Sequence, residues 1–383
     1  MLTPLVFGAT TALATINFLT SLANYKNSKY YPSYTPKVSF ISKCWNDGPV
    51  VERRIKNALA FDYPESKYEI IIVDNGSTDE TEKICKKYEK QGKIKYHREE
   101  HNELPAKVID RAIQKYSTGE IIVETDIDAL CPASWLKEMV KPYQDPNVGG
   151  VTGTVMCGNY HESWLTNLRA IEDFWFFCIS MAGRYKLTGQ GMLYGGCKSY
   201  SKKAWEKVRG HPKVLCEDAG LAAKIIGAGY RIAIQDTVPI VQEEVKTLRA
   251  YFKERKRWVY GNLEASHKYS KQLSRDKLNF TILTSNFSWD LVILGSLILL
   301  PFQLATIPLG ISLTALLIGL RKFKAKPIFY LWSPPYLLFG PILQTLATLA
   351  AIKDKLINGK VEWLKVRHYP TPLKFPTTDK FKL

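Results

Sequence analysis

Two aspartates spaced two residues apart carry the clearest chemistry in this chain. They are Asp126 and Asp128, and they follow the apolar run Ile-Ile-Val at residues 121–123. The β-branched run predicts a buried strand, and alternate residues of an extended chain point the same way. Both carboxylates can therefore face one site, where they would suit Mg²⁺ or Mn²⁺ carrying a diphosphate. The competing interpretation is a turn that happens to contain two acidic residues.

A second apolar run ends at Asp74 and leads into a tight turn. Asn75 and Gly76 predict the turn, and Ser77 or Thr78 can cap the helix that follows. A well-capped connection between a strand and a helix explains all of these residues except Asp74. That aspartate ends a buried strand and points toward the edge where ligands bind.

Two adjacent glycines and two adjacent acidic residues lie further along. Gly195 and Gly196 would let the backbone approach a ligand closely, although a plain turn before a strand at 198–200 is the alternative. Glu217 and Asp218 begin a helical pattern, and acidic residues in a first helical turn are a common structural feature. The residue types alone leave both choices open.

A basic stretch, Glu-Arg-Lys-Arg-Trp at residues 254–258, contains Arg257 and Trp258. Taken alone, it is compatible with an amphipathic helix lying on a membrane surface.

The elements that must position these residues alternate between strand and helix over residues 38–266. Strands are predicted at 38–41, 69–73, 93–97, 120–125, 148–155 and 231–234, and helices at 50–59, 78–91, 107–115, 133–143, 201–208 and 218–226. This alternation predicts an α/β domain with a mostly parallel sheet and helices on both faces. Ligands of such sheets bind outside the carboxyl ends of the strands, where the aspartates are expected.

Charge and cysteine content narrow the class of protein. The 383 residues include 53 Lys and Arg against 36 Asp and Glu, a net charge of +17. Much of the positive charge flanks apolar segments, and no compact basic motif with interleaved aromatics occurs, so a membrane surface is favoured over nucleic acid. Seven cysteines without a C-x-x-C spacing predict reduced thiols in a cytosolic domain.

The two ends of the chain are apolar. Residues 1–25 carry no charge and predict an N-terminal transmembrane helix; positive charges follow it, which places the next domain in the cytoplasm. A cleaved signal peptide is the alternative. Residues 267–352 predict interfacial and transmembrane helices, and 353–383 a basic cytoplasmic tail. The expectation is a multi-pass membrane protein whose number of spans is open.

The residues in their order along the chain resemble the inverting family-2 glycosyltransferases of GT-A fold. The segment 74–79, Asp-Asn-Gly-Ser-Thr-Asp, is similar to their D-D/N-G-S-T-D signature, and residues 126–128 to their D-x-D. Residues 216–218, Cys-Glu-Asp, resemble a T-E-D segment. Residues 254–258 resemble the Q-x-x-R-W signature of cellulose, chitin and hyaluronan synthases, with Glu254 in place of glutamine.

The resemblance implies a role for each candidate residue. Asp218 would be the general base beside Glu217, and Asp126 and Asp128 would hold Mg²⁺ or Mn²⁺. The residues expected to bind the donor are Trp45, Asn46, Asp47, Asp74, Lys107, Asp126 and Arg257. Those expected to border the acceptor are Gly195, Gly196, Cys197 and Trp258. For Lys107, a solvated position at the start of a helix is the competing interpretation.

The expected function is inverting transfer of a sugar from a nucleotide-diphosphate donor, expected to be UDP-linked, to a glycan acceptor, with processive polysaccharide synthesis as one form. Transfer of a single sugar to a lipid acceptor, a polyprenyl phosphate or a glycolipid, is the alternative. A polymer channel would need several packed helices or a homo-oligomer. Two other classes remain: a non-catalytic nucleotide-binding membrane protein, and a nucleotidyltransferase with a similar aspartate pair.

Overall fold

One mixed sheet forms the centre of the molecule. The computed structural model describes residues 2–22, 34–101, 105–271, 304, 306–358 and 371–377. Within these ranges, seven strands pair in the order β3-β2-β1-β4-β6-β5-β7. The strands are β1 Val38–Cys44, β2 Tyr68–Asp74, β3 Lys95–Arg98, β4 Ile121–Asp126, β5 Val148–Cys157, β6 Cys197–Ser201 and β7 Arg231–Gln242.

The sheet is mostly parallel, as the sequence predicts. β1 runs parallel to β2 and β4, β2 parallel to β3, and β5 parallel to β7. β6 alone runs antiparallel to its neighbours β4 and β5. In the register of β1, Cys44 pairs with Asp74 and Lys43 with Asp126, so both predicted aspartates lie at the same edge of the sheet.

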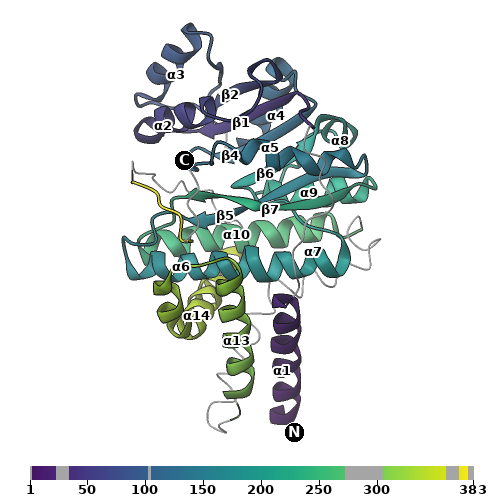
Figure 1. The fold of residues 1–383 in the computed structure, drawn as a ribbon, viewed down its shortest axis with the longest axis vertical. Coiled ribbons are helices and arrows are strands. Elements are labelled where there is room, and N and C mark those ends of the chain that lie inside the picture. Colours follow the sequence, from purple (N-terminus) through teal and green to yellow (C-terminus); the bar gives the residue numbers. More distant parts are fainter. Residues whose placement is uncertain are drawn as a thin grey trace.

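Helices cover both faces of this sheet (Figure 1). The helices of the domain are α2 Gly48–Leu59, α3 Thr81–Lys90, α4 Pro105–Tyr116, α5 Trp135–Val140, α6 Trp164–Trp175, α7 Ala182–Thr188, α8 Lys202–Lys207, α9 Glu217–Gly227 and α10 Leu248–Lys268; short 3-10 turns are η1 Glu65–Lys67 and η2 Lys141–Gln144, and η3 Phe176–Met181 is a π-helical segment. Beyond the domain are α1 Leu2–Ser21, α13 Thr306–Lys322 and α14 Pro327–Asn358.

The apolar runs of the central strands explain the two layers of helices. Successive side chains of a strand point to opposite faces. Phe40 and Ile72 therefore join the core beneath α2 and α5, whereas Ile41 and Val73 join a second core beneath α4 and α9. Because both faces are buried, the strands read as continuous apolar runs and not as alternating patterns.

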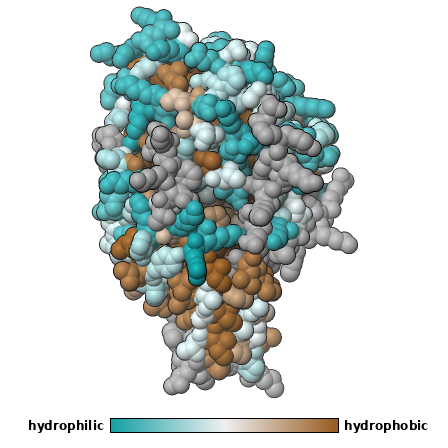
Figure 2. Space-filling view, viewed as in Figure 1, coloured by the Kyte–Doolittle hydropathy of each residue, from teal (hydrophilic) through white to brown (hydrophobic). Residues whose placement is uncertain are grey.

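α1 and α13 contact each other and project from one end of the domain (Figure 1). Their surface is largely apolar in Figure 2. Among the described residues, one helix is long and apolar enough to cross a membrane, Pro327–Leu356 within α14. The apolar stretch of α1, Pro4–Ile16, falls short of the ~20 residues that a span requires. The prediction of membrane helices at both ends is therefore corrected to one candidate helix, at the C-terminal end, and a multi-pass protein is not supported.

The C-terminal part departs from the predicted boundaries. α14 continues to Asn358, past the predicted end of the apolar region at residue 352. Residues 371–377 return to the domain, where the Thr371 carbonyl accepts a hydrogen bond from Arg53 at 2.7 Å and the Lys374 amide donates to the Gly158 carbonyl at 2.8 Å. Within the predicted membrane region 267–352, residues 272–303 and 305 lie outside the described residues, as does most of the predicted tail.

Candidate active site

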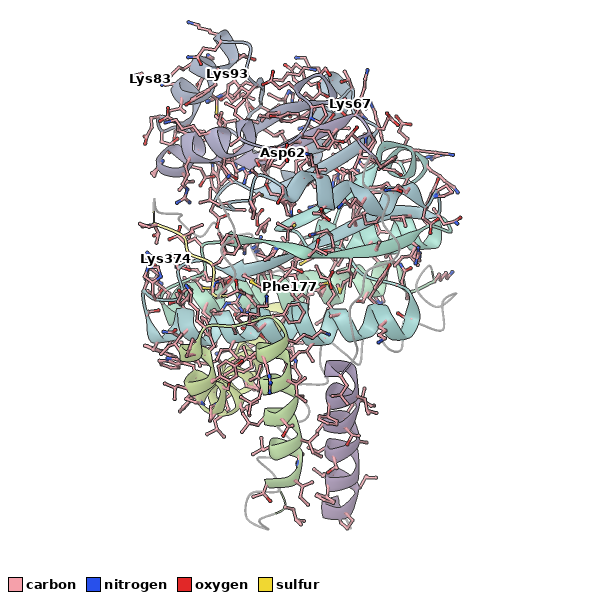
Figure 3. The ribbon with its side chains drawn as sticks, in the orientation of Figure 1. Asp62, Lys67, Lys83, Lys93, Phe177 and Lys374 are labelled. Atoms are coloured by element: carbon pink, nitrogen blue, oxygen red, sulfur yellow. The ribbon has the colours of Figure 1, made fainter. Side chains whose placement is uncertain are left out.

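A cavity of about 440 Å³ opens at the carboxyl edge of β1 and β4 and reaches α10 and α14. It brings together most of the residues that the sequence singles out. Phe177, labelled in Figure 3, belongs to its wall on η3. The predicted site residues that line it are Trp45, Asp47, Asp126, Asp128, Gly195, Gly196, Glu217, Asp218, Arg257 and Trp258.

Four predicted site residues, Asn46, Asp74, Lys107 and Cys197, do not line this cavity. Lys107 lies on α4, half-buried, while its neighbours Ala106 and Ile109 line the wall. Cys197 is fully buried at the start of β6. The roles expected of these four residues stay predictions.

Asp74 stabilises the loop after β2. Its fully buried carboxylate accepts hydrogen bonds from the Ser77 amide at 2.8 Å, the Ser77 hydroxyl at 2.6 Å and the Tyr96 hydroxyl at 2.5 Å. These bonds fix the turn in which Gly76 has a φ of +81°. Asn75 is the residue of this turn that lines the cavity.

The end of β1 forms the wall next to this turn. The Trp45 ring stacks on the His101 ring at 4.0 Å. Asn46, with a φ of +54°, accepts a hydrogen bond from the Thr78 amide at 2.7 Å through its side-chain carbonyl. Asp47 is buried at the start of α2. An aromatic plane next to backbone and carboxylate oxygens is suited to a flat heterocyclic base.

The two aspartates after β4 face the same cavity in different ways. Asp126 is partly exposed, whereas Asp128 is 2% exposed and accepts a hydrogen bond from the Glu243 amide at 3.0 Å. In the part of the chain that the structure describes, no cluster of three His, Cys, Asp or Glu side chains forms a complete metal site. A cation held here would need further oxygen ligands, as Mg²⁺ and Mn²⁺ take from a diphosphate.

The missing side chain of Gly196 leaves room beside these carboxylates. A Cβ there would lie 2.6 Å from Gln242 Oε1 and 3.3 Å from Asp126 Oδ2. Gln242 Oε1 is buried and has no hydrogen-bond partner among the described residues. An unpaired amide oxygen close to a carboxylate oxygen is a donor set that fits a hard divalent cation.

Asp218 stands on the other side of the two glycines. Its carboxylate accepts hydrogen bonds from the Gly195 amide and the Ala219 amide, each at 2.8 Å. Burial, and then the neighbouring Glu217 carboxylate, raise the pKa of Asp218. Burial opposes ionisation of Glu217 as well, but the charges of Lys198, Lys43 and His211 and a backbone hydrogen bond together outweigh burial and lower the pKa of Glu217. The pKa values of these two adjacent carboxyl groups are therefore shifted in opposite directions.

Helix α10 closes the cavity on the side facing the projecting helices. Gly261 allows close approach, because a Cβ there would lie 2.5 Å from Cys216 Sγ. The helix therefore packs directly on the loop before α9 and places Arg257 and Trp258 near Asp218. The Arg255 guanidinium lies over the Trp258 ring, with its Cζ atom 4.6 Å from the ring centroid.

Glu254 stands at the position that is glutamine in the Q-x-x-R-W signature. Burial, and then the Glu244 carboxylate, raise the pKa of Glu254 to about 8. At neutral pH this group is largely a neutral acid, which can donate a hydrogen bond as an amide can.

Sequence reasoning missed a buried polar group behind the base. Lys198 and Glu124 are both in the interior and pair at 3.2 Å, and His211 lies 3.3 Å from Glu124. A lysine inside the short segment 198–200 belongs to no motif, so the local sequence gives no signal for it.

Comparisons with known proteins point to the glycosyltransferases. Residues 39–209 match the family model described as "Glycosyl transferase family 2". The fold is that of a solved mannosyltransferase from Pyrobaculum calidifontis, in complex with GDP-Man and Mn²⁺; the two share 22% identity and a TM-score of 0.63, over 94% of this chain and 100% of the other. The family match and the named relatives support a glycosyltransferase, and the solved structure supports the fold.

Two curated relatives extend over most of the chain. A probable glycosyltransferase, YdaM, of Bacillus subtilis is 23% identical over 87% of this chain and 87% of its own length. A beta-monoglucosyldiacylglycerol synthase of Nostoc is 26% identical over 88% of this chain and 77% of its own length.

Proposed function

We propose that this chain transfers a sugar from a nucleoside-diphosphate donor to an acceptor hydroxyl with inversion at the anomeric carbon. The observation that carries the proposal is the position of Gly195 and Gly196 between two acids. Asp218 accepts from the Gly195 amide at 2.8 Å, and Asp126 Oδ2 lies 3.3 Å from the Cβ position of Gly196. A base and a carboxylate suited to a cation therefore flank one short backbone segment of the cavity.

The donor occupies the end of the cavity near β1 in this proposal. The nucleobase of the donor lies against Trp45 and Asn75, and its diphosphate lies along Asp126 and Asp128. A bound Mg²⁺ or Mn²⁺ would be held by these two carboxylates, with Gln242 beside them, and would neutralise charge on the departing diphosphate. The Mn²⁺ in the Pyrobaculum complex supports a divalent cation for this fold.

Asp218 removes the proton of the acceptor hydroxyl. Its raised pKa makes it a stronger base than an ordinary aspartate. Attack of the deprotonated oxygen on the face of the sugar opposite the leaving diphosphate gives inversion. Arg257 and Trp258 border the acceptor side, where Glu254 offers a neutral carboxyl group.

The acceptor side of the cavity reaches the apolar helix α14, whose residues Tyr336, Gly340 and Gln344 contribute to the wall. Only 28% of the most apolar stretch of this helix is buried inside the molecule. Its residue Leu331 is 74% exposed. A basic segment, residues 321–326, lies between α13 and α14. Apolar helices next to a cationic belt fit the surface of an anionic bilayer, with the catalytic domain on its cytoplasmic side.

This position favours an acceptor that the membrane presents. The name of the Nostoc relative describes a synthase of a glycosylated lipid, which is consistent with single transfer to a lipid-linked acceptor. A second candidate is extension of a glycan, because another relative, from Staphylococcus epidermidis, is named poly-beta-1,6-N-acetyl-D-glucosamine synthase. It is 26% identical over 59% of this chain and 55% of its own length.

One assay separates these possibilities. The full chain in membrane vesicles is incubated with a panel of UDP- and GDP-sugars, and released nucleoside diphosphate and labelled product are measured together. Release with one labelled lipid of fixed size supports single transfer, and a ladder of long chains supports extension. Release of pyrophosphate would point to a nucleotidyltransferase. Binding of nucleotide with no turnover for any donor would leave a nucleotide-binding protein.

A further inference from the structure

Lys198 is a charged residue in the interior of the domain. It lies on β6 and is 1% exposed. Its ammonium group pairs with Glu124 Oε2 at 3.2 Å and with Glu217 Oε1 at 3.6 Å. Burying an ammonium ion costs several kcal/mol unless carboxylates compensate it. A buried lysine with two carboxylate partners therefore needs a reason beyond packing.

The two partners belong to the two halves of the proposed chemistry. Glu124 is the direct neighbour of Lys198 across the antiparallel pair of β4 and β6, two residues before Asp126 on the same strand. Glu217 begins α9 and precedes Asp218. Lys198 thus links the strand that ends in the cation-binding aspartate to the helix that begins with the base.

We propose that Lys198 is a positioning residue for Asp218: its ammonium group holds the first turn of α9 against β4. The inference rests on the proposed function, because it assigns a role within that same site. Lys198 also contributes to the wall of the cavity, as Glu217 and Asp218 do. It acts through Glu217 and through its charge.

The charges around the base explain why one cation matters. Burial and Glu217 raise the pKa of Asp218, and Lys198 lowers it. The other charged groups that face this cluster are Lys43 on β1, Asp126 on β4, His211 before α9, and Arg257 and Glu264 on α10. Without Lys198, the two adjacent carboxyl groups would lose a cation that compensates their negative charge, and the pKa of Asp218 would rise further.

The test compares Lys198→Met with the wild-type chain in the nucleoside-diphosphate release assay, with kcat and donor KM measured across the acidic and neutral pH range. We expect kcat at neutral pH to fall about tenfold or more, with donor KM unchanged, and the acidic limb of kcat to move up by about one pH unit. Lys202→Met is the matched control, because Lys202 donates to the Ser117 carbonyl at 2.7 Å and does not line the cavity.

A second variant guards against misfolding. Lys198→Met leaves Glu124 buried without its lysine partner, so the pair Glu124→Gln with Lys198→Met removes one charge of each sign and leaves Glu217 and Asp218 without the cation. The same displaced limb is expected in the double variant. A uniform loss of kcat with the limb in its wild-type place, in the variant that folds, overturns the inference.

The turnover of the wild-type chain is measured first, because it separates a failure of the proposed function from a failure of the role of Lys198. No turnover of the wild-type chain with any nucleotide sugar is a failure of the proposed function. An active wild-type chain whose pH profile is shared by the Lys198 variants defeats only the role of Lys198.

Discussion

Glu217 and Asp218 are neighbours in sequence, but their surroundings give them different tasks. Lys198 forms an ion pair with Glu217, which favours the ionised form of that carboxyl group. The Asp218 carboxylate instead accepts hydrogen bonds from two backbone amides. A base must be free to take a proton, so Asp218 is the better candidate of the two. Glu217 is better described as part of its support.

We expect Asp218→Asn to lower kcat by a factor of about 10² to 10⁴, because an amide cannot accept the proton of the acceptor hydroxyl. The shape of the site is preserved, so the affinity for nucleoside diphosphate should not change. Nucleoside-diphosphate release and calorimetric titration with UDP and GDP measure the two quantities. Asp62→Asn is the control, since Asp62 is exposed and lies far from the projecting helices (Figure 3). An Asp218 variant with full turnover would argue for a different base.

We expect Gly196→Ala to weaken metal-dependent turnover, because the new methyl group would meet Gln242 Oε1 at 2.6 Å and crowd Asp126. The predicted result is a higher Mn²⁺ concentration for half-maximal activity, measured by metal titration of the release assay. Gly310→Ala on α13 is the matched control, because a Cβ there meets nothing within 4 Å. Equal metal requirements in both variants would place the cation elsewhere.

Local sequence singles out Asp126, Asp128 and Asp218 because they are adjacent to apolar runs, and the structure places all three at one cavity, while their roles stay predictions. Lys198 on β6 and Gln242 at the end of β7 give no such local signal, because their importance depends on which strand lies next to them. That information comes from long-range pairing, which the local sequence does not contain.

At the scale of elements, the central strands and their helices follow from local pattern. β1, β2 and β4 are apolar on both faces, and the predicted helices at 50–59 and 218–226 agree closely with α2 and α9. The antiparallel direction of β6 was not predicted, because it depends on the path taken by α6, η3 and α7 before it. The sequence pattern predicts no helix over residues 164–188, where α6, η3 and α7 lie.

His211 joins three elements, and its charge should make stability depend on pH. Its ring contacts Asp110 of α4 at 2.6 Å and Glu124 of β4 at 3.3 Å, before α9 begins. Burial lowers the pKa of His211, but the charge of Glu124 and the hydrogen bond to Asp110 outweigh burial and raise it to about 9.

Because the folded-state pKa is raised, the stabilisation is complete below pH 6.5, the ordinary value for histidine, and is lost as the pH rises through about 9. The whole effect is on the order of 3 kcal/mol. We expect the Tm of the wild-type chain to decrease as the pH rises from 6.5 to about 9, and the Tm of His211→Gln to depend less on pH. Thermal unfolding in detergent measures both. Parallel profiles for the two proteins would contradict this assignment.

At the scale of the whole molecule, apolar surface is concentrated at one end, next to the basic segment 321–326. Lys83 and Lys93 lie at the end of the domain opposite α1 and α13 (Figure 3), whereas the apolar surface gathers around those helices (Figure 2). Attachment to a bilayer through α14 and its neighbours would be apolar and only weakly sensitive to ionic strength.

We therefore expect the chain to remain in the membrane fraction after a wash with concentrated salt, which releases proteins held by charge alone. Quantitative immunoblotting of pellet and supernatant measures this, and a peripheral basic protein serves as control. Release of the chain by salt would show that its net charge of +17, and not the apolar helices, holds it at the membrane.

The central claim is that Asp218 and the cation-binding aspartates act on opposite sides of one sugar. Proton NMR of the product formed from an α-linked nucleotide sugar tests this most directly, because inversion by a single displacement gives a β-linked product. We predict a β-linkage from the wild-type chain and no new linkage from Asp218→Asn. An α-linked product from the wild-type chain would contradict the account.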